Sequence, residues 1–199
     1  MPFQTIDGIT SSVIPFCSED GIILVLLGQR IGTSRAFANA WGLVGGFLTP
    51  GIESLQQCGA RELKEETGLD VTAESLMLVT VQSAPKRDPR GQIIYTVWAI
   101  RLPCKLAPVA SDDIRALAWQ PLSHALTMEL AFDHRSSLHQ FAAICDHTAV
   151  EYDDLNLDSG GKNSWACQLV RIRPPYATIS SDLSVDSPSP QEVSPSHTW

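Results

Sequence analysis

The sequence predicts an α/β (α+β) fold in which a mixed β-sheet is sandwiched between helices. Short β-rich runs outnumber helical segments, and the two kinds do not alternate strictly along the chain. A repeating βαβ unit requires strict alternation, so a mixed sheet with helices on its faces fits better. The 199 residues are enough for one domain of this kind with a core of its own.

The first third of the chain supplies the first strands and the first helix. The β-rich runs at 10–16 and 21–27 are separated by the turn-like cluster CSEDG, which predicts a hairpin. A polar loop at 29–40 leads to a short strand at 41–47, WGLVGGF. The breaker TPG follows, and a helix is predicted over 54–67, with Gly68 just past its end.

The remainder of the predicted domain contains further strands and one or two terminal helices. The strands are expected at 76–84, 93–102 and 114–122. The first two are joined by the charged loop PKRDPRG, and the third ends at Pro121. From 124 to 147 apolar residues recur at helical spacing, which predicts the terminal helices.

The composition changes near residue 150. We therefore predict a domain over 1–150 and a C-terminal extension over 151–199, Ser/Pro-rich and disordered from about 177. The N-terminus lacks the basic start and apolar core of a signal peptide, and the longest apolar run is too short to cross a bilayer. A cytoplasmic protein with no membrane partner is expected.

Charge and cysteine usage exclude some classes of function. A net charge of −8 and a pI near 5.0 argue against a nucleic-acid partner, since such proteins usually present a basic face. They do not argue against a nucleotide substrate, because bound metal ions reverse the local sign of charge. The five cysteines are scattered without a CxxC pair, so they predict buried thiols rather than a zinc or redox motif.

The predicted helix at 54–67 carries an unusual group of acids. Glu62, Glu65 and Glu66 are spaced so that their side chains project from one patch. They lie toward the C-terminal end of the helix, where the backbone dipole disfavours negative charge. Such a group is either a solvated helix face or a site for a hard cation. Mg²⁺ and Mn²⁺ prefer carboxylate oxygens and bridge readily to phosphates.

The arrangement around these acids resembles the signature of the Nudix hydrolases. It reads Glu53, seven residues, Arg61-Glu62-Leu63, one residue, Glu65-Glu66, one residue, Gly68-Leu69, with a Gly-Gly strand upstream. One departure is that six residues rather than five separate Gly46 from Glu53, which implies a longer loop. Members of the family hydrolyse a nucleoside diphosphate linked to another group, X, with divalent metal ions.

The resemblance implies a role for each matching position. Glu62, Glu65 and Glu66 would bind Mg²⁺ (or Mn²⁺), and Gly46 would add a backbone carbonyl. Arg61 would pair with Glu53 or Glu65 and orient the ligating carboxylates. The general base would be Glu65 or an acid on a separate loop, for which Asp112 and Asp113 are candidates. The alternative interpretation of these two aspartates is a solvated turn.

A second resemblance narrows the family to one branch. The segments KRDPRG, SDD and LAFDH are similar to a branch that contains ADP-ribose pyrophosphatase-like enzymes and Nudix-domain transcriptional repressors that sense ADP-ribose. Its implied substrate is a nucleotide-type small molecule. The candidate substrate contacts are Arg87, Arg90, Arg30, Arg35 and Phe47. Each has a plain alternative as a turn or core residue, and His134 is predicted to be a packing residue at a helix start.

Three functional hypotheses remain open. The first is a pyrophosphohydrolase that prefers an ADP-ribose-type substrate. The second is a non-catalytic ADP-ribose sensor, which would need a DNA-binding domain after residue 150, where the chain is acidic and Ser/Pro-rich. The third is an enzyme for NADH, dinucleoside polyphosphates or nucleoside triphosphates. Related enzymes are often dimers, so a homodimer is a further expectation from the resemblance.

Overall fold

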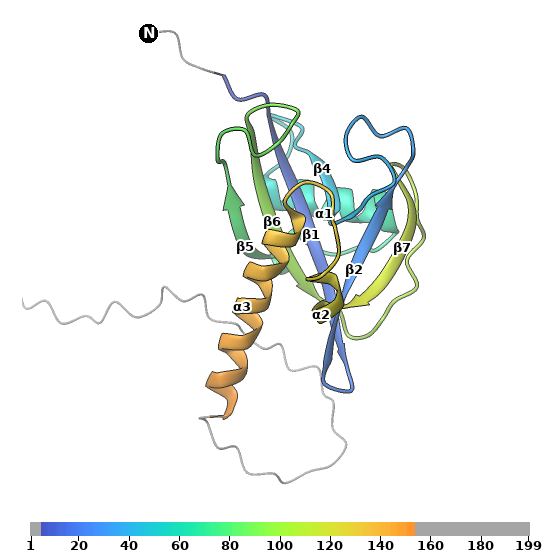
Figure 1. Cartoon of the computed structure of the whole chain (residues 1–199), viewed down its shortest axis with the longest axis vertical. Helices are drawn as coiled ribbons and strands as arrows, with labels where there is room; N and C mark the ends of the chain where they lie inside the picture. The colour runs from blue at the N-terminus through green and yellow to red at the C-terminus, as the bar shows by residue number, and fades with distance from the viewer. Residues whose placement is uncertain (1–4, 154–199) are drawn as a thin grey trace, which may run out of the picture. The chain divides into compact units, whose positions relative to one another are not determined.

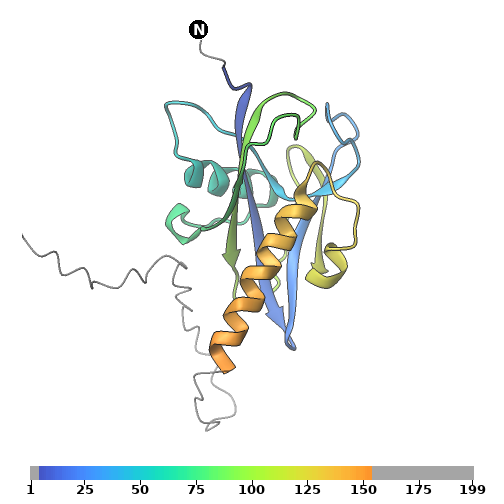
Figure 2. The same ribbon diagram turned by 60° about the vertical axis from the view of Figure 1, so that its left-hand side comes forward.

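A computed structural model describes residues 5–153, in which two helices, α1 (Leu55–Thr67) and α3 (His134–Asp153), lie on opposite faces of a mixed sheet (Figure 1). The turned view in Figure 2 shows the same two layers of helix with the sheet between them. The strands are β1 (Gly8–Glu19), β2 (Ile22–Arg30), β3 (Trp41–Gly42), β4 (Val44–Phe47), β5 (Met77–Gln82), β6 (Ile93–Arg101) and β7 (Ile114–Pro121). A short helix, α2 (Leu122–Ala125), follows β7 directly, and a 3₁₀ turn at Ala73–Ser75 precedes β5.

Strand β1 is the centre of the sheet. Along one edge it pairs in parallel with β6, from Gly8 opposite Ile93 to Phe16 opposite Arg101. Strand β5 pairs antiparallel with the far edge of β6. Strand β2 pairs antiparallel with β1 and, on its other edge, with β7. The combination of one parallel pair with antiparallel pairs confirms the predicted mixed sheet.

The other edge of β1 changes partner part-way along the strand. Residues Thr10–Val13 pair with β4, whereas residues Phe16–Glu19 pair with β2. Pro15 lies in the gap between these two ladders, where its missing N–H breaks no pairing with either strand. The sheet therefore forks at this point, and β2 continues away from β1 to pair with β3.

Each face of the sheet has its own apolar core. Under α3 the core combines Ile14, Val25, Leu27, Tyr95, Val97, Leu138 and Phe141. Under α1 it combines Val13, Leu26, Val44, Leu63, Trp98 and Ile100. The alternation of Val13 and Ile14 between the two cores follows from the period of two in a strand. Strand β1 is covered on both faces, and its buried run contains the polar residues Thr10, Ser11 and Ser12 as well as apolar ones.

Helix α1 begins and ends with strong local signals. Ser54 forms a capping box with Gln57, in which each side chain accepts from the other residue's backbone N–H. Gly68 ends the helix in a left-handed conformation, φ +73°, and donates its N–H to the Lys64 carbonyl. These signals confirm the predicted helix and place its acidic last turns at a fixed position against β4.

Some predicted details differ from the structure. The single strand expected at 41–47 is two strands, because Leu43 separates a segment that pairs with β2 from one that pairs with β1. The terminal region forms two helices, and α3 continues past residue 150 to Asp153. The rest of the predicted extension lies outside the described residues. Cys17 and Cys58 are buried as expected, but Cys104 is exposed. No helix in the described range has the length and apolar character needed to cross a membrane.

Candidate functional site

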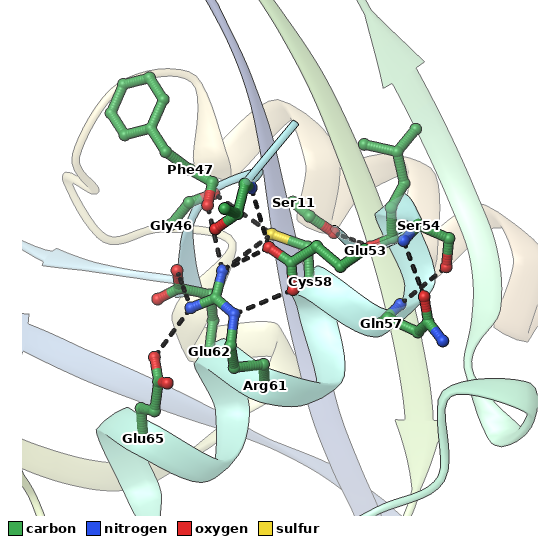
Figure 3. Close-up of polar contacts among 12 residues, drawn as sticks. Ser11, Gly46, Phe47, Glu53, Ser54, Gln57, Cys58, Arg61, Glu62 and Glu65 are labelled. Atoms are coloured by element: carbon green, nitrogen blue, oxygen red, sulfur yellow. Dashed lines mark hydrogen bonds and ion pairs between the residues drawn. The ribbon is translucent and has the colours of Figure 1, made fainter. Parts of the chain in front are cut away.

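Arg61 is the centre of an ion-pair cluster on α1 (Figure 3). Its Nε and Nη2 donate to the two carboxylate oxygens of Glu53, at 2.9 and 2.7 Å. Its Nη1 donates both to Glu62 Oε1 and to Glu65 Oε2, each at 2.8 Å. The guanidinium holds the pKa of Glu53 at about 2, and the paired carboxylates raise the pKa of Arg61. One cation thus brings Glu62 and Glu65 together.

The three glutamates of the signature differ in their surroundings. Glu62 and Glu66 are buried, whereas the Glu65 side chain is 48% exposed. Burial raises the pKa of Glu62, and it raises the pKa of Glu66 to about 8. The Gly45 N–H donates to Glu66 Oε2 at 2.9 Å and opposes part of that shift. In the absence of a cation, two carboxylates are therefore held in an environment that disfavours their charge.

Gly46 packs directly against the Glu62 carboxylate. A Cβ at position 46 would lie 2.5 Å from the carboxylate atoms of Glu62, so only glycine leaves room for that group. The Gly46 carbonyl lies 4.0 Å from the Cys58 sulfur, which burial keeps protonated by raising its pKa to about 12. The extra residue before Glu53 is accommodated in a turn at 49–52, where Thr49 N–H donates to Glu53 Oε1.

The side chains are of the kind that binds a divalent cation, but they do not surround a common metal position in this structure. Among the described residues, no group of three or more His, Cys, Asp and Glu side chains is arranged around a common metal position. Two of the three glutamates are instead joined through Arg61. Carboxylate oxygens are the ligands that Mg²⁺ prefers, and rotation of Glu62 and Glu65 away from Arg61 Nη1 would free them.

The loop with Asp112 and Asp113 lies at the C-terminal end of α1. Val109 N–H donates to the Thr67 carbonyl at 2.9 Å, and Ser111 N–H donates to the Glu66 carbonyl at 3.2 Å. Both aspartates are exposed. The charge of Asp112 contributes to the raised pKa of Glu62, and that of Asp113 to the raised pKa of Glu66. The loop therefore places both aspartates beside the acidic helix.

A pocket opens beside the fork in the sheet and adjoins the acidic helix through Gly45 and Gly46. It is lined by Thr10, Ser12, Arg30, Leu43, Gly45, Gly46, Arg87, Asp88, Arg90, Tyr95, Phe132 and His134. Three of the arginines predicted to contact substrate are therefore brought together. The fourth, Arg35, is exposed on the loop before β3 and does not line this pocket.

Two of the three pocket arginines are paired with aspartates. Arg90 binds both oxygens of Asp88, at 2.9 and 2.7 Å, and Arg87 Nη1 donates to Asp133 at 2.6 Å. Arg30 has no ion pair within residues 5–153 and donates its Nε–H to the Ala36 carbonyl. Of the pocket's charges, Arg30 is thus the cation left for an anionic ligand.

Aromatic rings lie against Arg90 and Phe132, two residues that line the pocket. The Arg90 guanidinium lies between the rings of Phe47 and Phe132, 4.8 and 4.5 Å from their centroids. Phe37 packs against Phe132 with 4.6 Å between centroids. Phe37 and Phe47 are both more than 40% exposed, so these flat surfaces are accessible for stacking. Trp41, by contrast, packs against the core under α3.

Sequence reasoning missed several pocket residues. Asp88 and Phe132 stand in the segments KRDPRG and LAFDH but were given no role, and Tyr95, within a strand, had no signal of its own. His134 was expected only to pack at a helix start. It does begin α3 and is buried, but its Nδ1 also accepts the Leu43 N–H at 2.9 Å, and it lines the pocket. The LAFDH segment was the one sequence signal pointing to it.

Comparison with known protein families gives a match to the NUDIX domain over residues 8–141. The chain belongs to the NUDIX domain family. The matched range begins with β1 and ends within α3, so it includes the acidic helix and every residue that lines the pocket. Membership confirms the resemblance inferred from the signature.

Curated relatives of this NUDIX chain include both an enzyme and a regulator. An ADP-ribose pyrophosphatase of Methanocaldococcus jannaschii is 34% identical over 131 residues, covering 64% of this chain and 73% of the relative. An ADPR responsive transcriptional repressor, NtrR of Acinetobacter baylyi, is 31% identical over 149 residues, covering 74% of this chain. The chain spans 56% of the length of that repressor.

Solved structures of other NUDIX proteins share the fold of this chain. The NUDIX domain of Shewanella oneidensis NrtR, in complex with ADP ribose, matches with a TM-score of 0.62 and 27% identity, over 71% of this chain and 89% of that one. A mutT/nudix family protein from Listeria innocua also has a TM-score of 0.62, with 33% identity over 74% and 99% of the two chains. These neighbours confirm the mixed sheet flanked by helices.

Proposed function

We propose that this NUDIX protein hydrolyses a nucleoside diphosphate linked to a second group, X, with Mg²⁺ (or Mn²⁺), and that ADP-ribose-type substrates are preferred. The observation that supports this most directly is that Glu62 and Glu65 both accept a hydrogen bond from one nitrogen of Arg61. Glu66 accepts one from the Gly45 N–H of β4, beside them. The similarity to an ADP-ribose pyrophosphatase supports the choice of substrate.

The proposed reaction is attack of water on one phosphorus of the diphosphate, which breaks the P–O–P bridge. With ADP-ribose the products are AMP and ribose phosphate. Glu62, Glu65 and Glu66, with the Gly46 carbonyl, would hold the divalent cation, which would supply positive charge to the phosphate oxygens. We expect Arg30 to bind a phosphate oxygen, because it lines the pocket and has no ion pair within residues 5–153.

The attacking water must lose a proton to a general base. Glu65 is the most exposed of the three glutamates, and Asp112 and Asp113 stand at the end of the same helix. A carboxylate reachable by solvent can accept a proton and release it again. Arg61 has a positioning role in this proposal. Its Nε and Nη2 are held by Glu53, and its Nη1 orients the carboxylates of Glu62 and Glu65.

The proposal is tested by turnover of a substrate panel with Mg²⁺. Purified protein is incubated with ADP-ribose, NADH, dinucleoside polyphosphates and nucleoside triphosphates, and product nucleotides are quantified. We expect AMP from ADP-ribose, and a loss of kcat of about 100-fold or more in Glu65→Gln and Glu66→Gln. Glu74→Gln, an exposed glutamate outside the site, is the matched control. Turnover that is unchanged in both site variants would refute the proposal.

An ADP-ribose sensor is the second candidate. It is favoured by the similarity to the repressor NtrR and to the NrtR domain in complex with ADP ribose. NrtR of Shewanella oneidensis also has a structure in complex with a 27mer DNA, whereas the acidic charge of this chain argues against a nucleic-acid partner. Tight ADP-ribose binding without turnover of any panel member would support the sensor. A cytoplasmic location and a homodimer remain predictions.

A further inference from the structure

His134 is a fixed hydrogen-bond donor in the wall of the pocket. Its Nδ1 accepts the Leu43 N–H at 2.9 Å, so the ring proton must reside on Nε2 when the imidazole is neutral. Burial, together with the charges of Arg30, Arg87 and Arg90, lowers the pKa of His134 to about 3 and keeps it neutral. Within residues 5–153 the bond to Leu43 is the hydrogen bond that the imidazole makes, which leaves the Nε2–H edge for the pocket.

The position of the imidazole is tightly constrained. Its ring stacks on Tyr95 with 5.5 Å between centroids and lies 5.4 Å from Phe132. A Cβ at position 42 would lie 2.7 Å from Nδ1, so Gly42 is needed to let the ring approach β3. A side chain this confined cannot turn its donor elsewhere, and its direction is set before any ligand binds.

A second donor without a partner accompanies it. The Arg87 Nε–H is buried and has no hydrogen-bond partner in the described part of the chain. The Arg87 guanidinium lies 4.9 Å from the centroid of the Tyr95 ring, which also contacts His134. Two N–H donors are therefore fixed against one aromatic ring. A buried donor left without an acceptor is costly, so a ligand that supplies one is favoured.

The charge balance at this end of the pocket indicates what kind of acceptor fits. Arg87 is neutralised by Asp133, Arg90 by Asp88, and His134 is neutral. The unpaired cation, Arg30, lies 5.7 Å from the centroid of the Phe132 ring, which also contacts His134, so its charge is not confined to the acidic helix. The two donors themselves belong to a neutral ring and to a guanidinium balanced by Asp133, so an oxygen without a full negative charge is sufficient as their acceptor.

We propose that His134 Nε2–H and Arg87 Nε–H bind an acceptor oxygen of the group X, such as a hydroxyl of the sugar in an ADP-ribose-type substrate. This inference rests on the proposed function only in taking the diphosphate to lie at the acidic helix. It makes His134 a specificity-determining residue: it contributes to binding of X, and it contributes nothing to binding of a nucleotide that lacks X.

A matched pair of substitutions separates this role from packing. In His134→Asn the side-chain oxygen stands where Nδ1 stood and still accepts the Leu43 N–H, but the Nε2 donor is lost. In His134→Gln an amide N–H reaches the position of Nε2. Calorimetric titration in EDTA, where turnover is not expected, gives the affinities for ADP-ribose and for ADP. We expect His134→Asn to weaken ADP-ribose binding about two- to tenfold, to leave ADP unchanged, and to be partly rescued in His134→Gln.

A spectroscopic measurement provides an independent readout. Long-range ¹H–¹⁵N correlation spectra should show His134 protonated on Nε2, with the Nε2 resonance shifted by ADP-ribose and not by ADP. An equal loss of affinity for ADP-ribose and for ADP in His134→Asn, or an unshifted Nε2 resonance, would overturn the inference and leave the proposed function standing. Failure of the wild-type protein to bind either ligand would count against the inference and the proposed function together. The turnover panel would then test the proposed function separately.

Discussion

At the scale of single residues, Arg61 stabilises the loop before α1 as well as the acids on it. It joins Glu53, which directly follows the turn at 49–52, to Glu62 and Glu65 on the helix. The Glu53 side chain is only 10% exposed, so this pair is better shielded from solvent than a typical surface ion pair. Glu53 is thus the fixed point from which the guanidinium reaches the glutamates of the site.

The pair predicts a specific dependence of stability on acid pH. The folded-state pKa of Glu53 is about 2, below its ordinary value of 4.5, so its contribution is fully present above 4.5 and is lost as the pH falls toward 2. We expect Glu53→Gln to lower the free energy of unfolding at neutral pH by about 1–3 kcal/mol. The difference from wild type should shrink as the pH falls through this window. Urea titrations across the window, with Glu74→Gln as control, measure it, and a constant difference would contradict the assignment.

The sequence predicted which acids of the site lie together, but not how deeply each is buried or how the arginines pair. Glu62, Glu65 and Glu66 stand in one short segment at fixed spacing, so sequence alone placed them together. Their different burial is not encoded in the spacing, because β4 and the 109–113 loop cover Glu62 and Glu66 but leave Glu65 open. Arg87 and Arg90 could be named as candidates, but their ion-pair partners, Asp133 and Asp88, could not, since the fold brings these side chains together.

At the scale of elements, α1 is held close to the sheet by the absence of a side chain at Gly59. A Cβ there would lie 3.1 Å from Ser11 Oγ and 3.2 Å from Trp98 Cδ1. Ser11 Oγ donates to the Leu55 carbonyl at 2.7 Å and accepts from the Trp98 indole at 2.9 Å. The helix that carries the acids is thereby fixed to β1 and β6, which gives a reason for a glycine in the middle of a helix.

We expect Gly59→Val to destabilise the protein by about 1–3 kcal/mol, because the added atoms must displace α1 from β1. Equilibrium urea unfolding measures the change. Lys64→Val is the control on the same helix, since it adds the same branched side chain at an exposed position whose pair with Asp70 contributes little. Helix propensity alone would make Gly59→Val slightly more stable and Lys64→Val slightly less stable, so a Gly59→Val protein at least as stable as wild type would contradict the role of the close approach.

The elements themselves were mostly predictable from local signals. Ser54 and Gly68 bound α1, and the apolar runs mark β1, β2 and β6. The division of 41–47 into β3 and β4 was not, because β-propensity says that a segment is extended and not which strand it pairs with. The fork of the sheet beside Pro15 is a property of pairing, and no periodicity reveals it.

At the scale of the whole molecule, cation binding should be visible as stability. Burial of Glu62 and Glu66 makes their charges unfavourable in the metal-free protein, and a bound cation removes that cost. At a Mg²⁺ concentration of about 100 times Kd, we expect about 2.7 kcal/mol of added stability. Thermal unfolding in Mg²⁺ and in EDTA, at equal ionic strength, measures the gain. The gain should disappear when Glu62, Glu65 and Glu66 are all changed to Gln; its persistence would place the cation elsewhere.

The pocket draws on the chain from Thr10 in β1 to His134 at the start of α3. As the polypeptide leaves the ribosome, the acidic helix is available long before the residue that closes the opposite wall. Loss of α3 would therefore remove His134 from the pocket wall and, at the same time, uncover the core that Leu138 and Phe141 complete.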